Sequence, residues 1–307
     1  MTDKAESYDV AVVGGGPAGL TSALWLARYL HSVILIDSGD PRNWETRGVN
    51  GFLGESGIKP AQLRGYGRAE CEKYGVEFVD DCVETATNKN GDIFSLTLKS
   101  GRCISARRVL LAIGIKDVWP DIEGLDRCYG ETVHVCPDCD GYESRGKKVA
   151  IVGEGRKAVG MALALTTWTE QIVIFTNGEP ANISTEHCDQ LGKLNIPVIE
   201  AKIRRLISNG DEICAVELDG DMQLDCQSLF FAIGQYPADD LGAQLKCERD
   251  ELGLIVVDDR YHTSVKNVFA AGDIVPGPQL AIAAASDGAI AALAIHHSLV
   301  PEERRLK

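Results

Sequence analysis

The sequence predicts an α/β fold made of two similar units, and three observations indicate it. A β-type segment at Tyr8–Val13 leads into a glycine-rich turn and then an alanine- and leucine-rich stretch to about Leu30. The same order begins again near Lys148. Each half later ends with a similar phrase, LLAIGIKDVWP at 110–120 and FFAIGQYPADD at 230–240. Because strand–turn–helix–strand units build parallel sheets, the chain is expected to repeat one βαβ architecture.

Composition sets the broad class of protein. The chain has 307 residues, of which 45% are hydrophobic and 25% charged, as expected for about two folded domains. The net charge of -14 argues against a nucleic-acid partner, since no basic patch could outweigh that field.

No transmembrane segment or export signal is expected. The most apolar stretch, Leu280–Leu299, is interrupted by Asp287, Gly288 and a histidine pair, whereas a membrane helix needs about 20 apolar residues. The first residues, MTDKAESYDV, lack the cationic and apolar regions of a signal peptide. We therefore expect a cytoplasmic protein that is not bound to a membrane.

The first glycine-rich turn has the spacing of a nucleotide-binding loop. Gly14, Gly16 and Gly19 fit G-x-G-x-x-G between a strand and a helix. These glycines allow a tight turn, close approach to a pyrophosphate and close helix packing. Asp37 ends the next strand, 23 positions after Gly14 (37 − 14), where a carboxylate can bind ribose hydroxyls. The alternative is a glycine-rich turn without a ligand.

Further elements follow in order along the chain. Residues 76–112 are rich in β-type segments, and the second unit starts with the strand VAIVG. A helix through Leu165 and a strand at Ile172–Phe175 come next, then the β-type segments EICAVEL and QSLFFAIG. The last part predicts a strand pair from Gly253, the phrase VFAAGD and a helix over 279–296. Domain boundaries are expected near Asp117 and Gly242.

The second glycine-rich turn lacks a residue that would recognise a ribose. Gly153, Gly155 and Ala158 repeat the pattern, but Thr176–Glu179 offers neither an acid at the strand tip nor a basic cluster. Arg156 and Lys157 lie inside the turn and could touch a phosphate. Three interpretations stay open here: weak NADPH binding, another donor or cofactor such as a second nucleotide or flavin, or a structural relic of duplication.

The most informative segment is HVCPDCDGY at 134–142. The C-x-x-C spacing of Cys136 and Cys139 allows a reversible disulfide and lowers the pKa of one thiol. A zinc site would need further ligands at the right spacing, and none is present, so no metal is expected. An inert pair is the other alternative. Small buried hydrophobes are the expected role of the remaining cysteines: Cys71, Cys82, Cys103, Cys128, Cys188, Cys214, Cys226 and Cys247.

Over nearly its full length the chain resembles the low-molecular-weight thioredoxin reductase family. Four motifs in the family's order carry the resemblance: VVGGGPAG at 12–19, CPDCDG at 136–141, FAIG at 231–234 with Pro237, and TSVKNVFAAGD at 263–273. The resemblance implies two Rossmann-like three-layer ββα dinucleotide-binding domains in a thioredoxin-reductase-like homodimer. Residues 1–117 and 242–307 would form a discontinuous FAD-binding domain, and 118–241 a central NAD(P)H-domain-like domain that carries the C-x-x-C pair.

The resemblance also implies roles for individual residues. Cys139 would exchange electrons with the flavin, Cys136 would attack the partner disulfide, and Asp140 would donate and accept the proton. A simple turn-capping acid is the alternative for Asp140. The residues implied in FAD binding are Gly14, Gly16, Ala18, Gly19, Asp37, Ser38, Asn50, Val83, Gly272, Asp273, Gln279, Leu280 and Ala281.

Three departures from the family bear on the electron donor. The family's His-Arg-Arg-type cluster is replaced by Thr176-Asn177-Gly178, its Arg-Gln-Ala by Gln279-Leu280-Ala281, and its Ala-Thr-Gly by Ala112-Ile113-Gly114. Relatives with such changes are reductases fed by ferredoxin or a further flavin, or dithiol oxidases that pass electrons to oxygen.

We therefore predict an FAD-dependent disulfide oxidoreductase of thioredoxin-reductase type. Its donor would be other than NADPH, such as ferredoxin or another flavin. It would act on a thioredoxin-like protein or on a small-molecule disulfide or dithiol. A dithiol oxidase and a non-enzymatic flavin redox sensor are the alternatives.

Overall fold

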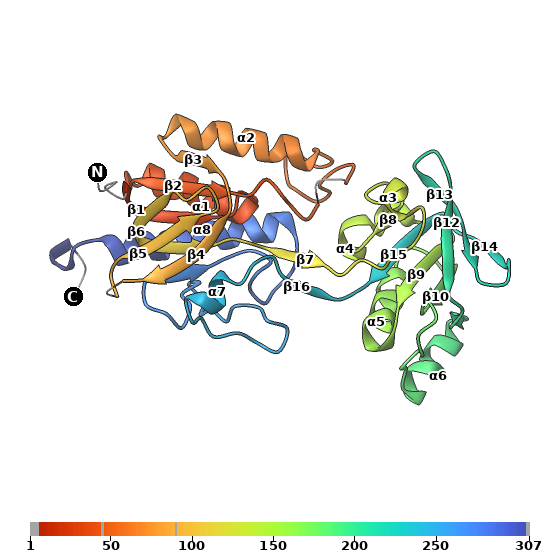
Figure 1. Cartoon of the computed structure of the whole chain (residues 1–307). Helices are drawn as coiled ribbons and strands as arrows, with labels where there is room; N and C mark the ends of the chain where they lie inside the picture. The colour runs from red at the N-terminus through yellow and green to blue at the C-terminus, as the bar shows by residue number, and fades with distance from the viewer. Residues whose placement is uncertain (1–5, 44–45, 90, 305–307) are drawn as a thin grey trace. The chain divides into compact units, whose positions relative to one another are not determined.

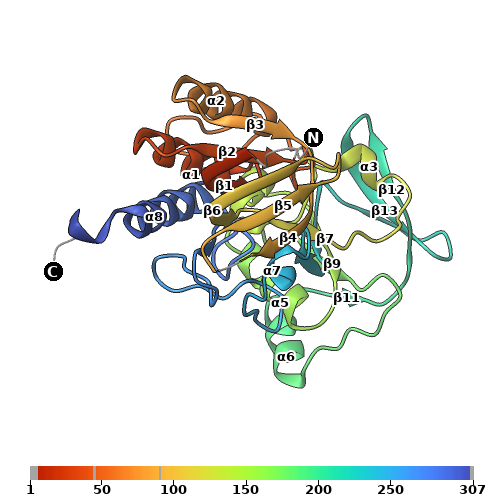
Figure 2. The same ribbon diagram turned by 60° about the vertical axis from the view of Figure 1, so that its left-hand side comes forward.

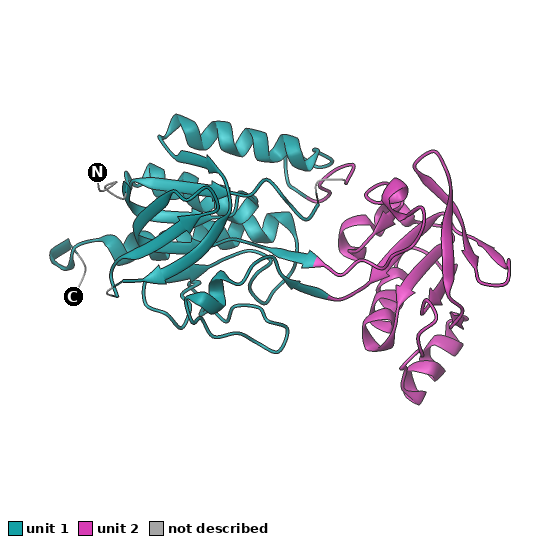
Figure 3. Cartoon of the chain, in the orientation of Figure 1, with its two compact units in different colours: residues 1–44, 52–116, 235–307 teal, residues 45–51, 117–234 magenta. Residues whose placement is uncertain are grey.

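The computed structural model describes residues 6–43, 46–89 and 91–304. The chain forms two compact units, coloured separately in Figure 3. Unit 1 comprises residues 1–44, 52–116 and 235–307, and unit 2 comprises 45–51 and 117–234. A two-stranded sheet of β7 (Ile115–Asp117) and β16 (Gln235–Pro237) lies where the chain leaves and re-enters unit 1.

The unit boundaries differ from the predicted ones by more than one residue at two places. Residues 235–241, expected in the central domain, belong to unit 1, where the amide of Ala238 donates to the carbonyl of Gly114 at 3.2 Å. The adjoining helix α7 (Leu241–Gln244) also contacts strand β4 (Val83–Asn88), because the Gln244 side chain accepts from the Ala86 amide at 2.8 Å. Residues 45–51, expected in the first domain, belong to unit 2.

Unit 1 is built around a seven-stranded sheet, in which six strands follow the order β3-β2-β1-β6-β5-β4 and the seventh, β17, pairs with β6. Its parallel strands are β1 (Glu6–Val13), β2 (Val33–Asp37), β3 (Glu77–Asp80), β6 (Cys103–Leu111) and β17 (Val268–Ala270). Its antiparallel strands are β4 (Val83–Asn88) and β5 (Phe94–Leu98). Strand β5 pairs with the first half of β6 and β17 pairs with the second half. The buried side chains of β4 and β5 pack against those of β1 and β2, so the antiparallel part folds over the parallel part as a second layer. The apolar residues of β2 and of the second half of β1, VAVV, fit strands that are covered on both faces.

Helices cover the parallel part of this sheet. Helix α1 (Pro17–Arg28) packs against α8 (Ala281–Leu299), and α2 (Pro60–Lys73) lies beside α1 (Figure 1 and Figure 2). Helices α1 and α8 approach so closely that a Cβ at Gly288 would lie 2.1 Å from the Ala18 carbonyl oxygen. The contact therefore requires glycine at this position. By length and composition α8 could cross a membrane, but buried core helices pass the same test. Its small residues Ala291 and Ala292 are fully buried in the core that α1 shares.

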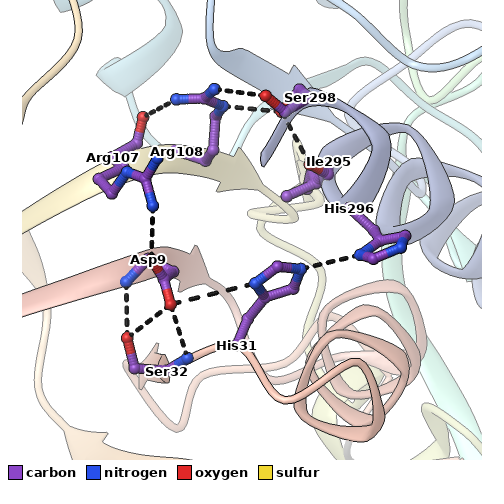
Figure 4. Close-up of polar contacts among 8 residues, drawn as sticks. All are labelled: Asp9, His31, Ser32, Arg107, Arg108, Ile295, His296 and Ser298. Atoms are coloured by element: carbon purple, nitrogen blue, oxygen red, sulfur yellow. Dashed lines mark hydrogen bonds and ion pairs between the residues drawn. The ribbon is translucent and has the colours of Figure 1, made fainter. Parts of the chain in front are cut away.

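Polar contacts fix the C-terminal end of α8 in unit 1 (Figure 4). The guanidinium of Arg108, on β6, donates to the hydroxyl of Ser298 at 2.7 Å and to its carbonyl oxygen at 2.9 Å. His31 Nε2 lies 3.0 Å from His296 Nδ1, and His31 Nδ1 lies 4.0 Å from a carboxylate oxygen of Asp9. The end of the last helix is therefore tied to the first and sixth strands.

Unit 2 has the same layered plan. Its parallel sheet, in the order β11-β10-β9-β15-β8, contains β8 (Val133–His134), β9 (Val149–Gly153), β10 (Ile172–Phe175), β11 (Val198–Ile199) and β15 (Ser228–Ala232). An antiparallel sheet contains β12 (Ile203–Asn209), β13 (Glu212–Leu218) and β14 (Gln223–Asp225). The helices are α3 (Leu125–Cys128), α4 (Pro137–Asp140), α5 (Gly155–Leu165) and α6 (Thr185–Lys193). Short 3₁₀ turns occupy Tyr142–Ser144 in this unit and Glu302–Arg304 in unit 1.

One core of unit 2 joins the parallel sheet to the antiparallel sheet, and another joins the parallel sheet to α5 and α6. Both units are therefore three-layer ββα domains of Rossmann type, and the predicted fold class is confirmed.

Candidate redox site and nucleotide-binding turns

The first glycine-rich turn, in unit 1, has the shape that a pyrophosphate needs. A Cβ at Gly14 would lie 2.2 Å from the Ala112 carbonyl oxygen, and one at Gly19 would lie 1.9 Å from the Gly14 carbonyl oxygen. Both glycines are thus required by backbone packing. A Cβ at Gly16 would meet nothing within 4 Å, and Gly16 precedes α1 without a side-chain cap. The open side of the turn therefore faces the start of a helix, where backbone N–H groups attract phosphate.

Asp37 lies directly beside this turn at the end of β2. A Cβ at Gly15 would lie 2.2 Å from a carboxylate oxygen of Asp37, so any other residue there would displace the Asp37 side chain. Ser38 follows Asp37 and is exposed, and the Asp37 carbonyl accepts from the amide of Asp81, two residues before Val83. In the structure Asp37 therefore lies beside the glycine-rich turn. Val83 follows two residues after Asp81, at the start of β4.

The predicted residues near the start of α8 gather on the same part of unit 1. Gly272 has a φ of 80°, and a Cβ there would lie 2.9 Å from the Ala18 side chain. Asp273 follows Gly272, and Leu280 precedes the first helical residue, Ala281. These positions and the first glycine-rich turn therefore form one surface, which suits a dinucleotide such as FAD.

Two further residues of this surface were missed by the sequence analysis. The guanidinium of Arg42 lies 3.4 Å from an Asp273 carboxylate oxygen and donates to the Gln279 side chain at 2.9 Å. The Gln279 amide donates to the Gln235 side chain at 3.1 Å. Arg42 is a lone cation in a loop, so its position gave no signal. The related family has an arginine at the position of Gln279. Arg42 contacts Gln279 and so supplies a cation from another part of the chain.

Cys136 and Cys139 form a disulfide in unit 2, with their Cα atoms 5.3 Å apart. The sulfur of Cys136 caps α4 by accepting from the Cys139 amide at 3.2 Å, and Pro137 takes the first helical position, where proline is favoured. A Cβ at Gly141 would lie 2.5 Å from the Trp168 ring, so the turn after the pair also requires glycine. The two sulfurs are therefore held on a short, well-defined helical turn.

Asp140 ends this turn and has an unusual proton affinity. Burial, followed by the nearby Glu143, raises the pKa of Asp140 to about 7. The carboxyl group is thus poised to donate and accept a proton near neutral pH. His134 Nδ1 lies 3.5 Å from an Asp140 carboxylate oxygen, and burial lowers the pKa of His134 to about 4. Cys136 supplies the helix cap through its sulfur, and Asp140 is the last residue of the helix.

Asn50, implied in FAD binding, lies with the redox turn of unit 2. Its side-chain amide donates to the carbonyl oxygen of Cys139 at 3.1 Å. The same segment is joined to unit 2 by the Arg47 amide, which donates to the Gly130 carbonyl at 3.0 Å, and by an ion pair between Arg47 and Glu131. Asn50 is therefore part of unit 2, whereas the other residues implied in FAD binding belong to unit 1.

The second glycine-rich turn is partly closed by its own chain. The amide of Gly155 donates to the carbonyl of Ala181 at 2.8 Å, and the side chain of Asn182 donates to Glu154 at 2.8 Å. The loop after β10 is also fixed by the Ala181 amide, which donates to Glu200 at 2.9 Å. The ammonium group of Lys157 donates to the backbone carbonyl of Ile233. Two groups expected to face a pyrophosphate, the Gly155 amide and the Lys157 ammonium group, thus have protein partners.

The remaining cysteines divide evenly between core and surface. Those that are buried, as expected, are Cys71, Cys128, Cys226 and Cys247. The expectation was wrong for the exposed ones, which are Cys82, Cys103, Cys188 and Cys214. Across the described ranges, no group of three or more His, Cys, Asp or Glu side chains could hold a metal ion.

Two nucleotide-binding folds with a dithiol turn define the class of the flavin-dependent disulfide oxidoreductases. The family model for pyridine nucleotide-disulphide oxidoreductases matches residues 8–288, and the chain belongs to this family.

Individual relatives agree with this class. The chain is 29% identical to thioredoxin reductase of Helicobacter pylori, over 94% of this chain and 97% of that protein. The crystal structure of HlmI superposes with a TM-score of 0.91 at 35% identity, over 99% of this chain and 95% of that one. An oxidoreductase from Agrobacterium tumefaciens superposes with a TM-score of 0.85 at 30% identity, over 95% and 98%. The chain spans only 45% and 59% of the length of two longer curated relatives.

Proposed function

We propose that the protein is a disulfide oxidoreductase that transfers electrons between a bound FAD and the Cys136–Cys139 pair, with a donor other than NADPH. The observation that carries the chemistry is the disulfide on α4 beside Asp140, whose pKa is raised to about 7. A reversible disulfide with a buried acid at its side is suited to thiol–disulfide exchange.

The residues of unit 1 fit an FAD molecule. Gly16 leaves open space where the backbone can approach a pyrophosphate, and Asp37 lies beside the turn, where a ribose would bind. Arg42, Asp273 and Gln279 would contact the remainder of the cofactor. When bound, FAD supplies a carrier that takes up or releases two electrons.

The chain's own residues perform the exchange at the disulfide. A thiolate of the partner attacks one sulfur of the pair, and the departing cysteine thiolate takes the proton of Asp140. Asp140 then accepts the proton of the partner's second thiol, and the partner leaves as a disulfide. In the opposite direction the same steps reduce a partner disulfide. We propose a thioredoxin-like protein or a small-molecule disulfide or dithiol as that partner.

The second glycine-rich turn supports a donor other than NADPH. The Gly155 amide and the Lys157 ammonium group are bound to backbone carbonyls of the same unit. Thr176 and Asn177 follow β10, where a nucleotide-binding domain would present an acid or arginines to the ribose. The Asn177 side chain is also engaged, because it accepts from the Ile203 amide at 2.9 Å. Ferredoxin or another flavin is the donor class that we propose.

Anaerobic stopped-flow absorbance at the flavin band tests the donor. The FAD-loaded protein is mixed with excess NADPH, with excess NADH, and with dithiothreitol as the control for the cysteine pair. We expect dithiothreitol to bleach the flavin and both nucleotides to fail. Bleaching by NADPH at a typical turnover rate, about 10 per second, would overturn the proposed donor.

Oxygen uptake tests the direction of flux. With a disulfide reductase, an added dithiol should cause little oxygen consumption beyond that of free flavin. Catalytic oxygen uptake that requires both the dithiol and the intact Cys136–Cys139 pair would instead identify a dithiol oxidase. A Cys139→Ser variant is the control in both assays. The homodimer and the cytoplasmic location stay predictions.

A further inference from the structure

His134 is a buried histidine that lies against the acid of the redox turn. It ends strand β8, which pairs with β15 so that His134 is opposite Phe230. Its ring centroid lies 5.1 Å from the Phe230 ring, and the residue is only 8% exposed. Its Nδ1 atom lies 3.5 Å from a carboxylate oxygen of Asp140. A buried imidazole is thus directed at the group that handles the proton.

The charges around the two side chains favour one arrangement of protons. Arg47 and Lys147 add to burial in disfavouring a protonated His134, and Glu143 adds to burial in disfavouring an ionised Asp140. Phe230 contributes only an apolar surface. Between about pH 4 and about pH 7 the pair therefore holds one acidic proton, which is on Asp140, and the imidazole is neutral.

We propose that His134 is a positioning residue that stabilises the Asp140 carboxylate formed during thiol–disulfide exchange at the cysteine pair. The inference rests on the proposed function and adds a residue to it. A neutral imidazole can carry its proton on Nδ1, which lies 3.5 Å from the carboxylate oxygen, so the two groups must approach slightly for that N–H to donate when Asp140 ionises.

The protons and electrons balance for a dithiol that reduces the pair. The dithiol loses two electrons as its internal S–S bond forms, and the Cys136–Cys139 bond gains them as it breaks. One proton of the dithiol goes to solvent, and Asp140 protonates the first departing cysteine. Asp140 then accepts the dithiol's second proton, and the second cysteine takes its proton from solvent. Between the two transfers Asp140 is a buried carboxylate, the state that the His134 N–H stabilises.

A charge-assisted hydrogen bond is about twice as strong as a neutral one, so His134 stabilises the carboxylate more than the acid. Without this donor the carboxylate of Asp140 would form less readily, and exchange would need a higher pH. The expected signature is therefore a shift in the pH profile, which a merely structural residue would not cause.

The test measures the rate at which dithiothreitol reduces the Cys136–Cys139 disulfide between about pH 5 and about pH 9. Samples are quenched with acid, alkylated and counted by peptide mass, so that the other cysteines are scored separately. The variants are His134→Phe, His134→Asn, Asp140→Asn and the double variant with His134→Phe and Asp140→Asn. His187→Asn, a histidine on α6 in the same unit, is the matched control.

Relative to the wild type at each pH, His134→Phe should raise the midpoint of the profile by about one unit, the value of one hydrogen bond to a charged group. His134→Asn, whose amide can still donate, should have a midpoint between those of the wild type and His134→Phe. In the Asp140→Asn background, His134→Phe should leave the profile unchanged. His187→Asn should match the wild type.

An unshifted midpoint in His134→Phe and His134→Asn overturns the proposal. The proposal is also overturned if His134→Phe slows disulfide reduction equally in the wild-type and Asp140→Asn backgrounds, because the effect would then be structural. Thermal unfolding of each variant shows whether His134→Phe is misfolded. If it is, the midpoint of His134→Asn decides the outcome. The assay needs no flavin donor or protein partner, so failure of the proposed donor would appear only in the turnover experiments.

Discussion

The side-chain amide of Asn50 donates a hydrogen bond to the carbonyl oxygen of Cys139 at 3.1 Å, across 89 positions of sequence. A segment from the first part of the chain thereby holds the backbone of the redox turn. The family resemblance assigns Asn50 to FAD, so its two possible roles can be separated by experiment.

We expect Asn50→Ala to destabilise the oxidised protein by about 1 kcal/mol, the net value of one hydrogen bond. Asn50→Asp removes the donor while keeping the shape, and should lose at least as much. Chemical denaturation measures the loss, and absorbance of the purified protein gives the flavin content. Loss of flavin with unchanged stability would instead assign Asn50 to the cofactor.

Asp140 predicts a pH-dependent stability. Its pKa is raised from 3.8 to about 7 in the folded protein, so folding favours the neutral acid. The stabilisation is complete below about pH 4 and is lost as the pH rises through about 7. Asp140→Asn stays neutral, so its stability relative to the wild type should rise over that range, reaching a few kcal/mol at about pH 8.

Urea denaturation of the wild type and Asp140→Asn at about pH 5 and about pH 8 checks this expectation. The side chain of Asp140 is 18% exposed, so solvent reduces the effect below its full value. A stability difference that does not change with pH would contradict the raised pKa. Asp138→Asn, on the same turn, is the matched control.

Two glycines of the first turn should respond differently to alanine. Gly19→Ala places a Cβ 1.9 Å from the Gly14 carbonyl oxygen, and should cost more than about 3 kcal/mol or prevent folding. Gly16→Ala meets no protein atom within 4 Å, and should fold normally but bind FAD at least about tenfold more weakly. Thermal unfolding of the flavin-free proteins and flavin titration measure the two effects. Equal flavin affinity in Gly16→Ala and the wild type would place the pyrophosphate elsewhere.

The closed second turn predicts slow hydrogen exchange. The Gly155 amide is bound to the Ala181 carbonyl, and the Asn182 side chain holds the same loop through Glu154. We expect peptides that cover 153–158 and 176–184 to be protected from exchange, with no change when NADPH is added. Asn182→Ala should speed exchange in both peptides, whereas Asn209→Ala, on β12, should not. New protection of either peptide by NADPH would show that the turn opens to bind it.

Much of the fold was predictable because its signals are local. Gly14 and Gly19 are spaced for a turn whose backbone leaves no room for a Cβ, and Asp37 follows its strand directly. The cysteine pair and Asp140 lie within five consecutive residues. Such patterns depend on contacts between near neighbours in the sequence, so they can be recognised without coordinates.

The errors arose where distant segments meet. Arg42 contacts Gln279 across 237 positions, and no local pattern marks such a pair. The second domain boundary was placed near Gly242, but the Gln244 side chain binds strand β4 and draws the preceding residues into unit 1. The contact of His134 with Asp140 was also missed, although the two are close in sequence, since it depends on how β8 meets α4.

The discontinuity of unit 1 sets an order for folding during synthesis. Strand β17, which pairs Val268 with Val109, joins the sheet of unit 1 only after nearly the whole chain has left the ribosome. The strands of the unit 2 parallel sheet all lie between residues 133 and 232, so this sheet can form earlier. Unit 1 can therefore be completed only after unit 2 has been synthesised, and the apolar face of β1 and β2 that packs with α8 stays uncovered until then. A nascent chain stalled near residue 250 would have a folded unit 2, while the apolar residues of β1 and β2 would be exposed to chaperones.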